Sequence, residues 1–89
     1  MNEKNENLNH DLILRSRKRM EMSGISEVSS FDEREIIAQA SNTGISIDGE
    51  NLKIEKFDAD NGELIISGLI SGIFYYSKEL KKKRMGLFK

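Results

Sequence analysis

The side chains best suited to chemistry are sparse in this 89-residue sequence. It contains a single histidine, His10, and no cysteine, so it offers neither a thiolate nucleophile nor a cysteine ligand for a metal. A catalytic triad needs a histidine that a folded element positions, whereas His10 follows a polar, aperiodic segment. Neither a Gly-rich phosphate loop nor a Gly-x-Ser-x-Gly elbow is present. We therefore expect no catalytic residue, no cofactor site, no metal site and no enzyme activity.

The acidic segment from Asp58 to Glu63 is the one place that warrants comparison with a calcium loop. An EF-hand loop places oxygen ligands at its first, third and fifth positions and glycine at the sixth. Asp58 and Asp60 fit the first and third positions, but Gly62 falls at the fifth. Because the register fails by one residue, we interpret this segment as a β-turn with solvated carboxylates.

The formal net charge of −1 is distributed very unevenly along the chain. Residues 1–22 carry five positive and four negative side chains, residues 23–77 carry three and ten, and residues 78–89 carry six and one. An acidic body with a basic tail indicates contact with an anionic surface or an acidic partner. A second basic cluster, expected in a turn, consists of Arg15, Arg17, Lys18 and Arg19.

The basic tail combines cations with apolar side chains. Its candidate contact residues are Lys81, Lys82, Lys83, Arg84, Leu87 and Phe88. Such a segment can adsorb on an anionic membrane, since each cation near the surface contributes about 1 kcal/mol while apolar residues insert. A solvated tail that aids solubility and a protein-docking segment are the alternatives. Nucleic acid is the least favoured partner, because aromatic residues do not alternate with the basic ones as they do in stacking platforms.

The elements that must position these residues are short strands. Residues 1–10 are polar and aperiodic, which is typical of a disordered arm. Across residues 11–77, apolar residues alternate in short runs that turn residues separate. The pattern predicts one all-β domain of seven or eight short, mainly antiparallel strands in a meander that forms a small sandwich or roll. Residues 78–89 then form a basic amphipathic tail.

Turn chemistry favours antiparallel pairing. Asn42-Thr43-Gly44, with Gly44 free to take positive φ, and Asp48-Gly49 are both hairpin signals. A short β-solenoid is the alternative, because its strands are also regularly spaced and punctuated by glycine. Residues 31–40 contain helix formers after an acidic start, so a short helix is a second alternative there. The alternating runs on either side favour a strand.

The last apolar stretch, residues 64–76, is apolar on both strand parities and is expected to hinge near Gly68 or Gly72. It is too short and too interrupted to span a bilayer. A strand that is apolar on both faces lies either in the centre of a small fold or against a partner. The second interpretation makes a homo-oligomer an open alternative. The start of the chain shows no secretory signal, so we expect a cytoplasmic protein.

A series of motifs runs from His10 to Tyr76, about three quarters of the chain. It begins with His10-Asp11 and the basic hairpin turn and continues with Gly24-Ile25-Ser26-Glu27-Val28, Ser30-Phe31-Asp32-Glu33, Gly44-Ile45-Ser46-Ile47, Gly49-Glu50-Asn51-Leu52-Lys53-Ile54, Gly62-Glu63-Leu64-Ile65-Ile66 and Gly68 to Tyr75. In their order and spacing, these motifs resemble the YabP family of sporulation proteins from endospore-forming bacteria. The sister family YqfC shares the later glycine pattern, but residues 24–32 bring this chain closer to YabP. The tail end, residues 86–89, also looks like the short basic end of that family.

The resemblance implies a non-enzymatic structural or assembly protein that is required for endospore formation, in spore coat or cortex assembly. It implies sporulation proteins as partners, among them an integral membrane sporulation protein, and it supplies no catalytic residues. Together with the tail, it predicts a protein of the mother-cell cytoplasm that lies peripherally at the outer forespore membrane. A protein-binding regulatory module of sporulation is the alternative function.

Overall fold

The computed structural model describes residues 9–77, which form one antiparallel sheet. The sheet has the order β1-β2-β6-β5-β4-β3, and every pairing in it is antiparallel. The all-β class is thereby confirmed, and residues 9–77 contain none of the parallel stacking that a solenoid requires. The strands are β1 (Leu12–Arg15), β2 (Arg19–Met22), β3 (Glu27–Phe31), β4 (Glu35–Ala40), β5 (Thr43–Asp58) and β6 (Glu63–Ser77).

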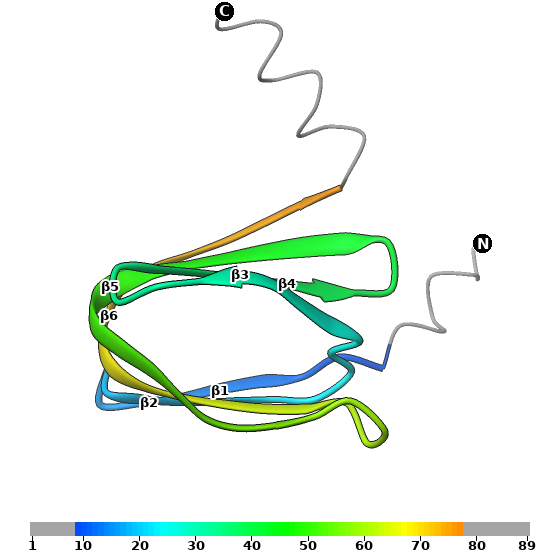
Figure 1. The fold of residues 1–89 in the computed structure, drawn as a ribbon, viewed down its shortest axis with the longest axis horizontal. Helices are drawn as coiled ribbons and strands as arrows, with labels where there is room; N and C mark the ends of the chain where they lie inside the picture. Colours follow the sequence, from blue (N-terminus) through cyan, green and yellow to red (C-terminus); the bar gives the residue numbers. More distant parts are fainter. Residues whose placement is uncertain (1–8, 78–89) are drawn as a thin grey trace, which may run out of the picture.

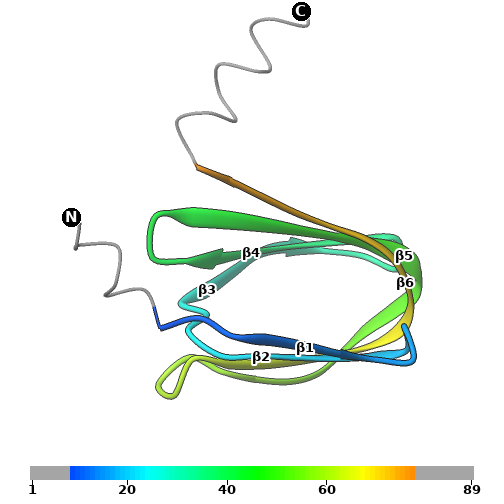
Figure 2. The same cartoon turned by 180° about the vertical axis from the view of Figure 1, so that it is seen from behind.

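The long strands β5 and β6 form a bent hairpin that passes through both layers of the fold (Figure 1). In one layer, the strands lie side by side in the order β6 (residues 72–77), β5 (residues 43–48), β4 and β3. In the other layer, the order is β5 (residues 53–58), β6 (residues 63–67), β2 and β1. Figure 2 shows the same two layers from behind. The sheet is therefore an open roll, as the alternation of apolar residues predicts.

Irregular backbone produces the bend. The β5–β6 register shifts between Asp48 and Gly49 and again between Glu50 and Lys53. Opposite these shifts, Gly68 has a φ of 127°, and an added Cβ there would approach the backbone of Asn51 and Leu52. A side chain would clash at this point, so glycine lets the two strands stay close where they turn. The expected hinge near Gly68 is thus present, within one continuous strand.

The two charged turns of the sheet hold the bend from either side. The β1–β2 turn accepts hydrogen bonds from β6, with 3.1 Å from the Gly68 nitrogen to the Lys18 oxygen and 2.8 Å from the Ile70 nitrogen to the Arg17 oxygen. The β3–β4 turn accepts a hydrogen bond from β5, with 3.0 Å from the Gly49 nitrogen to the Arg34 oxygen. The turns therefore satisfy backbone groups that the register shifts would leave unpaired.

Two turn predictions were wrong. There are six strands rather than seven or eight because β5 continues through Asp48-Gly49 and because the apolar stretch of residues 64–76 lies in one strand, β6. Asp48-Gly49 is not a hairpin turn but the bend inside β5. The β4–β5 turn consists of Ser41 and Asn42, because Ala40 already pairs with Thr43. Ser41 takes the positive φ, 62°, that was expected at Gly44. Gly44 instead lies under the Tyr76 ring, where a Cβ would collide with the ring.

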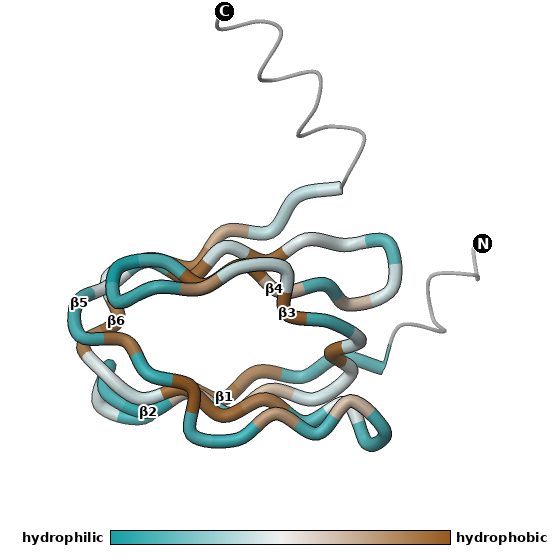
Figure 3. The backbone as a smooth tube through the Cα atoms, in the orientation of Figure 1, coloured by the Kyte–Doolittle hydropathy of each residue, from teal (hydrophilic) through white to brown (hydrophobic). Residues whose placement is uncertain are grey.

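The helix alternative for residues 31–40 was also wrong, and the strand prediction was right. In β4, Ile36, Ala38 and Ala40 are fully buried at every second position, which is the period of a strand and not of a helix. These residues face the core between the layers, whose apolar segments appear in brown in both layers of Figure 3.

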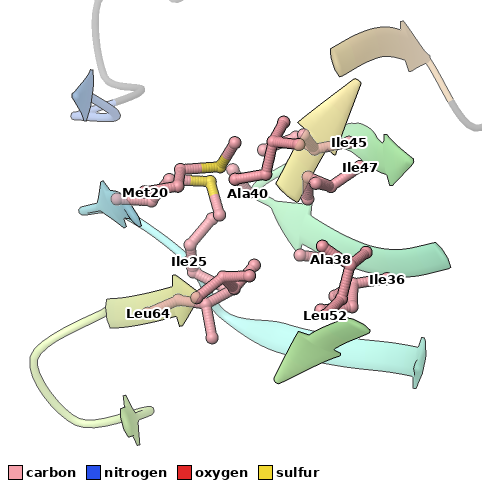
Figure 4. Packing of buried hydrophobic residues seen from close by; sticks show 12 residues of the cluster. Met20, Ile25, Ile36, Ala38, Ala40, Ile45, Ile47, Leu52 and Leu64 are labelled. Carbon is pink, nitrogen blue, oxygen red and sulfur yellow. The ribbon is translucent and has the colours of Figure 1, made fainter. Parts of the chain in front are cut away.

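The core consists of apolar side chains from both layers that meet between them (Figure 4). Its fully buried large members come from β2, β4, β5, β6 and the β2–β3 connection. They are Met20, Ile25, Ile36, Ile45, Ile47, Leu64 and Ile66. Each such side chain stabilises the fold by about 1.5–3 kcal/mol relative to full exposure. Ile25 is the one that lies between strands, so it closes the end of the roll where the chain crosses from one layer to the other.

Candidate interaction surfaces

The predicted basic cluster lies at the β1–β2 hairpin, and three of its four side chains contact a partner within the fold. The Arg19 Nε lies 3.1 Å from a Glu21 carboxylate oxygen, and the Arg15 Nε lies 3.8 Å from the same oxygen. Arg17 donates from Nε to the carbonyl oxygen of Ile70 at 3.1 Å. Arg17 and Lys18 are both exposed and form no ion pair with the part of the chain that the structure describes.

Arg17 therefore has a structural role that its charge alone did not indicate. Its backbone oxygen accepts a hydrogen bond from Ile70, and its guanidinium returns one to the Ile70 oxygen. The turn that carries it has positive φ at both Ser16 (53°) and Arg17 (59°). The hairpin thus clamps the bend of β6.

The other predicted contact residues belong to the basic tail. Residues 78–89 lie outside the described part of the chain, as do residues 1–8 of the predicted arm. The described chain ends at Ser77 of β6, in the layer that contains β3 and β4 (Figure 1).

His10 is a residue that sequence reasoning missed. Its Nδ1 lies 2.7 Å from the carbonyl oxygen of Ser23, and its Nε2 lies 2.8 Å from the Tyr75 hydroxyl. The His10 and Tyr75 rings also meet edge to face, with centroids 5.5 Å apart. Burial raises the pKa of Tyr75, which keeps its hydroxyl protonated. Both partners of His10 are distant in sequence, so no local pattern could have identified this contact.

The Asp58 turn is a local hydrogen-bonded turn, in agreement with the sequence prediction. The Asp58 carboxylate accepts hydrogen bonds from the backbone nitrogens of Asp60 and Asn61, and from the Asn61 amide at 2.8 Å. These bonds, those from Asn61 first, hold the pKa of Asp58 below its ordinary value of 3.8. Gly62 closes the turn with a φ of 76°.

A shallow hollow lies beside this turn and the start of β1. It is lined by Asp11, Ile13, Glu21, Met22, Ser23, Asn61 and Glu63. Glu21 in it is engaged by arginine, and Glu63 pairs with the Lys56 ammonium at 2.9 Å. Within residues 9–77, no group of three or more His, Asp or Glu side chains is placed to hold a metal ion. The hollow is therefore a surface depression in which two of the three carboxylates are ion-paired.

Exposed apolar side chains gather at the margins of the roll. Phe74 and Tyr75 near the end of β6 are 56% and 51% exposed, and Phe31 at the end of β3 is 60% exposed. Tyr75 lies in the cross-strand row of the buried Ala38 and Ile45, while Phe74 points to the opposite face. Exposed aromatic residues at a sheet margin are typical of surfaces that contact a partner.

None of the described residues forms a helix, so residues 9–77 contain no helical segment suited to crossing a membrane.

The described residues form an open antiparallel roll, so the chain belongs to the class of small all-β proteins. Residues 6–82 match the model of the YabP family, so the chain belongs to that family. It is also similar to "Spore protein YabP" of Bacillus subtilis (strain 168), with 29% identity over 79 residues that cover 89% of this chain and 79% of that protein.

Proposed function

We propose that this protein is a non-enzymatic assembly protein of endospore formation. The observation that carries the proposal is the family match across residues 6–82, together with the similarity to a spore protein along nearly the whole chain. The described structure adds a compact roll whose charged turns are used to hold the fold. Its exposed features are sheet margins and aromatic side chains, which serve binding better than catalysis.

The proposal extends to where the protein acts. In it, the protein is cytoplasmic in the mother cell, contributes to coat or cortex assembly, and lies at the outer surface of the forespore membrane. Support comes from the tail of residues 78–89, whose six cations accompany four large apolar side chains. Such a tail attracts anionic lipid through charge and adds apolar insertion, with partners that include an integral membrane sporulation protein.

The first experiment concerns the biological role. Deletion of the gene in the bacterium that encodes this chain is expected to lower the yield of heat-resistant spores without changing vegetative growth. Complementation by the full chain restores the yield. Normal spore yield and normal coat and cortex in the deletion strain would contradict an essential assembly role.

The second experiment concerns the tail. Purified full-length protein is sedimented with vesicles of phosphatidylglycerol and phosphatidylcholine, beside pure phosphatidylcholine vesicles, at low and high salt. Co-sedimentation with anionic vesicles only, weakened by salt, is expected because exposed charges are screened. A variant with Lys81, Lys82, Lys83 and Arg84 changed to Gln should remain in solution, while one with Arg15 and Arg19 changed to Gln should bind as the wild type does. Wild-type protein that stays in the supernatant would reject membrane attachment.

The acidic body supports a second candidate, a protein-binding regulatory module. Residues 23–77 carry ten acidic and three basic side chains, so a basic partner would match this surface. A pull-down from sporulating cells distinguishes the two functions, because a regulatory module is expected to retain one soluble partner in stoichiometric amount. An assembly protein at the membrane is expected to recover membrane fractions instead.

A further inference from the structure

The described sheet has four margins, and three of them carry features that discourage pairing with another strand. Strand β1 is only four residues long and ends in Arg15. Strand β3 begins with the charged Glu27 and has a register shift between Val28 and Ser30. The second half of β5 carries four charged side chains, Lys53, Glu55, Lys56 and Asp58. Short edges, bulges and charges are the means by which β proteins avoid edge-to-edge association.

The fourth margin, the second half of β6, has none of these features. No charged residue occurs between Leu69 and Ser77. Residues 72–77 pair with residues 43–48 of β5 in an unbroken register. The β1–β2 turn, on the other side of β6, reaches no further than Ile70 among the described residues. Among residues 9–77, no strand pairs with Gly72 to Tyr75 on the side away from β5, so every second residue there directs its N–H and C=O groups outward. Figure 1 and Figure 2 both show this part of β6 at the border of its layer.

Aromatic side chains flank this margin on both faces of the sheet. Phe74 lies in the outer row with Ser46 and Ile37, and it is more than half exposed. Tyr75 lies on the opposite face, where the hydrogen bond between its hydroxyl and His10 fixes its orientation. An aromatic side chain held in one rotamer loses little entropy on contact, and aromatic cross-strand pairs stabilise sheets.

Charge indicates which partner fits. Residues 23–77 carry an excess of seven negative charges, so two copies repel each other wherever these acidic side chains would meet. The neutral margin of β6 is the place where they can approach. Two identical strands that run antiparallel are related by a twofold axis, so each copy supplies the donors that the other accepts. We propose that the protein self-associates by antiparallel pairing of Ile73–Tyr75 with the same segment of a second copy, so that Phe74 lies opposite Phe74 at the twofold axis and two sheets join into one.

Self-association of this kind would explain physically how the protein takes part in assembly. Its biological meaning rests on the proposed function, but the pairing itself does not. Pairing of this kind is a property of the purified chain. If the purified chain dimerises but its deletion leaves spore formation intact, the assembly role is rejected and the dimer stands. If deletion impairs spore formation but the purified chain stays monomeric, the dimer is rejected and the assembly role stands.

The test is sedimentation equilibrium of the full chain at protein concentrations up to about 1 mM, which detects weak association. A monomer–dimer equilibrium is expected for the wild type. In F74K, two lysines would face each other near the twofold axis, and the dissociation constant should rise at least tenfold. The matched control is I13K, which places the same charge on the β1 margin. Ile13 is 47% exposed, similar to Phe74, and the I13K variant should associate as the wild type does.

A second measurement locates the contact without weakening it. The chain has no cysteine, so F74C and I13C each introduce a single thiol. Paired residues in adjacent antiparallel strands have Cα atoms about 4.5–5.5 Å apart, within the range for a disulfide. Mild oxidation should therefore give a covalent dimer of F74C and not of I13C. Any of three results would overturn the proposal. The wild type could remain monomeric throughout, F74K could leave the dimer intact, or cross-linking could occur through I13C in place of F74C.

Discussion

The imidazole Nε2 of His10 lies 2.8 Å from the hydroxyl oxygen of Tyr75, a residue 65 positions away. The other ring nitrogen, Nδ1, lies 2.7 Å from the Ser23 carbonyl oxygen, which can only accept a hydrogen bond. Nδ1 therefore carries the proton in the neutral ring, and Nε2 accepts from the tyrosine. One side chain thus connects the start of β1, the β2–β3 connection and the end of β6.

Replacement of Tyr75 by Phe removes this hydrogen bond and keeps the ring contact. The free energy of unfolding is expected to fall by about 1 kcal/mol, since a net protein hydrogen bond contributes about 0.5–1.5 kcal/mol. His10→Ala should cost more, because it removes both hydrogen bonds and the edge-to-face contact. Urea unfolding of both single variants and the double variant measures the coupling, and additive effects would show that the two side chains do not interact.

Gly68 is expected to be the glycine least tolerant of a side chain. Gly68→Ala places a Cβ at a φ of 127° and 2.6 Å from the Asn51 backbone oxygen, so the bend of the hairpin must open. We expect a loss of about 2 kcal/mol or more in the free energy of unfolding. Gly72→Ala is the control, because Gly72 lacks positive φ and its nearest neighbour is the movable Phe74 ring at 3.1 Å. Equal effects of the two substitutions in thermal unfolding would contradict this account of the bend.

Local signals predicted the strands well and the long-range geometry poorly. The basic cluster was correctly expected in a turn, and the alternating runs beside residues 31–40 correctly favoured a strand there, because both signals depend only on neighbours in sequence. The structure alone shows which face of β4 is buried. Asp48-Gly49 was mistaken for a hairpin turn because that dipeptide does favour such turns. Its actual conformation depends on the Gly49 nitrogen donating to Arg34, a contact that forms only after the sheet folds. The same reason explains why the roles of His10 and Arg17 could not be predicted.

Ile25 should be among the most sensitive core positions. It is fully buried at the crossing between the layers, and its nitrogen donates to the Gly62 oxygen at 2.9 Å. Ile25→Ala leaves a cavity that the fixed backbone cannot fill and should cost about 2–5 kcal/mol. A domain of this size has a total stability of only about 5–15 kcal/mol, so the variant should melt far below the wild type. Ile13→Ala, at an exposed position, should stay within about 0.5 kcal/mol of it. A small effect at Ile25 would show that the end of the roll is loosely packed.

The Asp58 turn should make stability depend on pH in the acid range. Hydrogen bonds from Asn61 lower the pKa of Asp58 below 3.8 in the folded chain, so folding favours the ionised carboxylate. This contribution is fully present above the unfolded pKa and is lost as pH falls through the lower, folded pKa. Asp58→Asn keeps an acceptor but removes the charge, so it should destabilise the protein at pH 7 and approach the wild type at low pH. Asp60→Asn is the control, because the Asp60 carboxylate accepts no hydrogen bond from the described residues. Urea unfolding at a series of pH values measures the difference, and a gap between wild type and Asp58→Asn that stays constant down to the lowest pH would contradict ionisation as its cause.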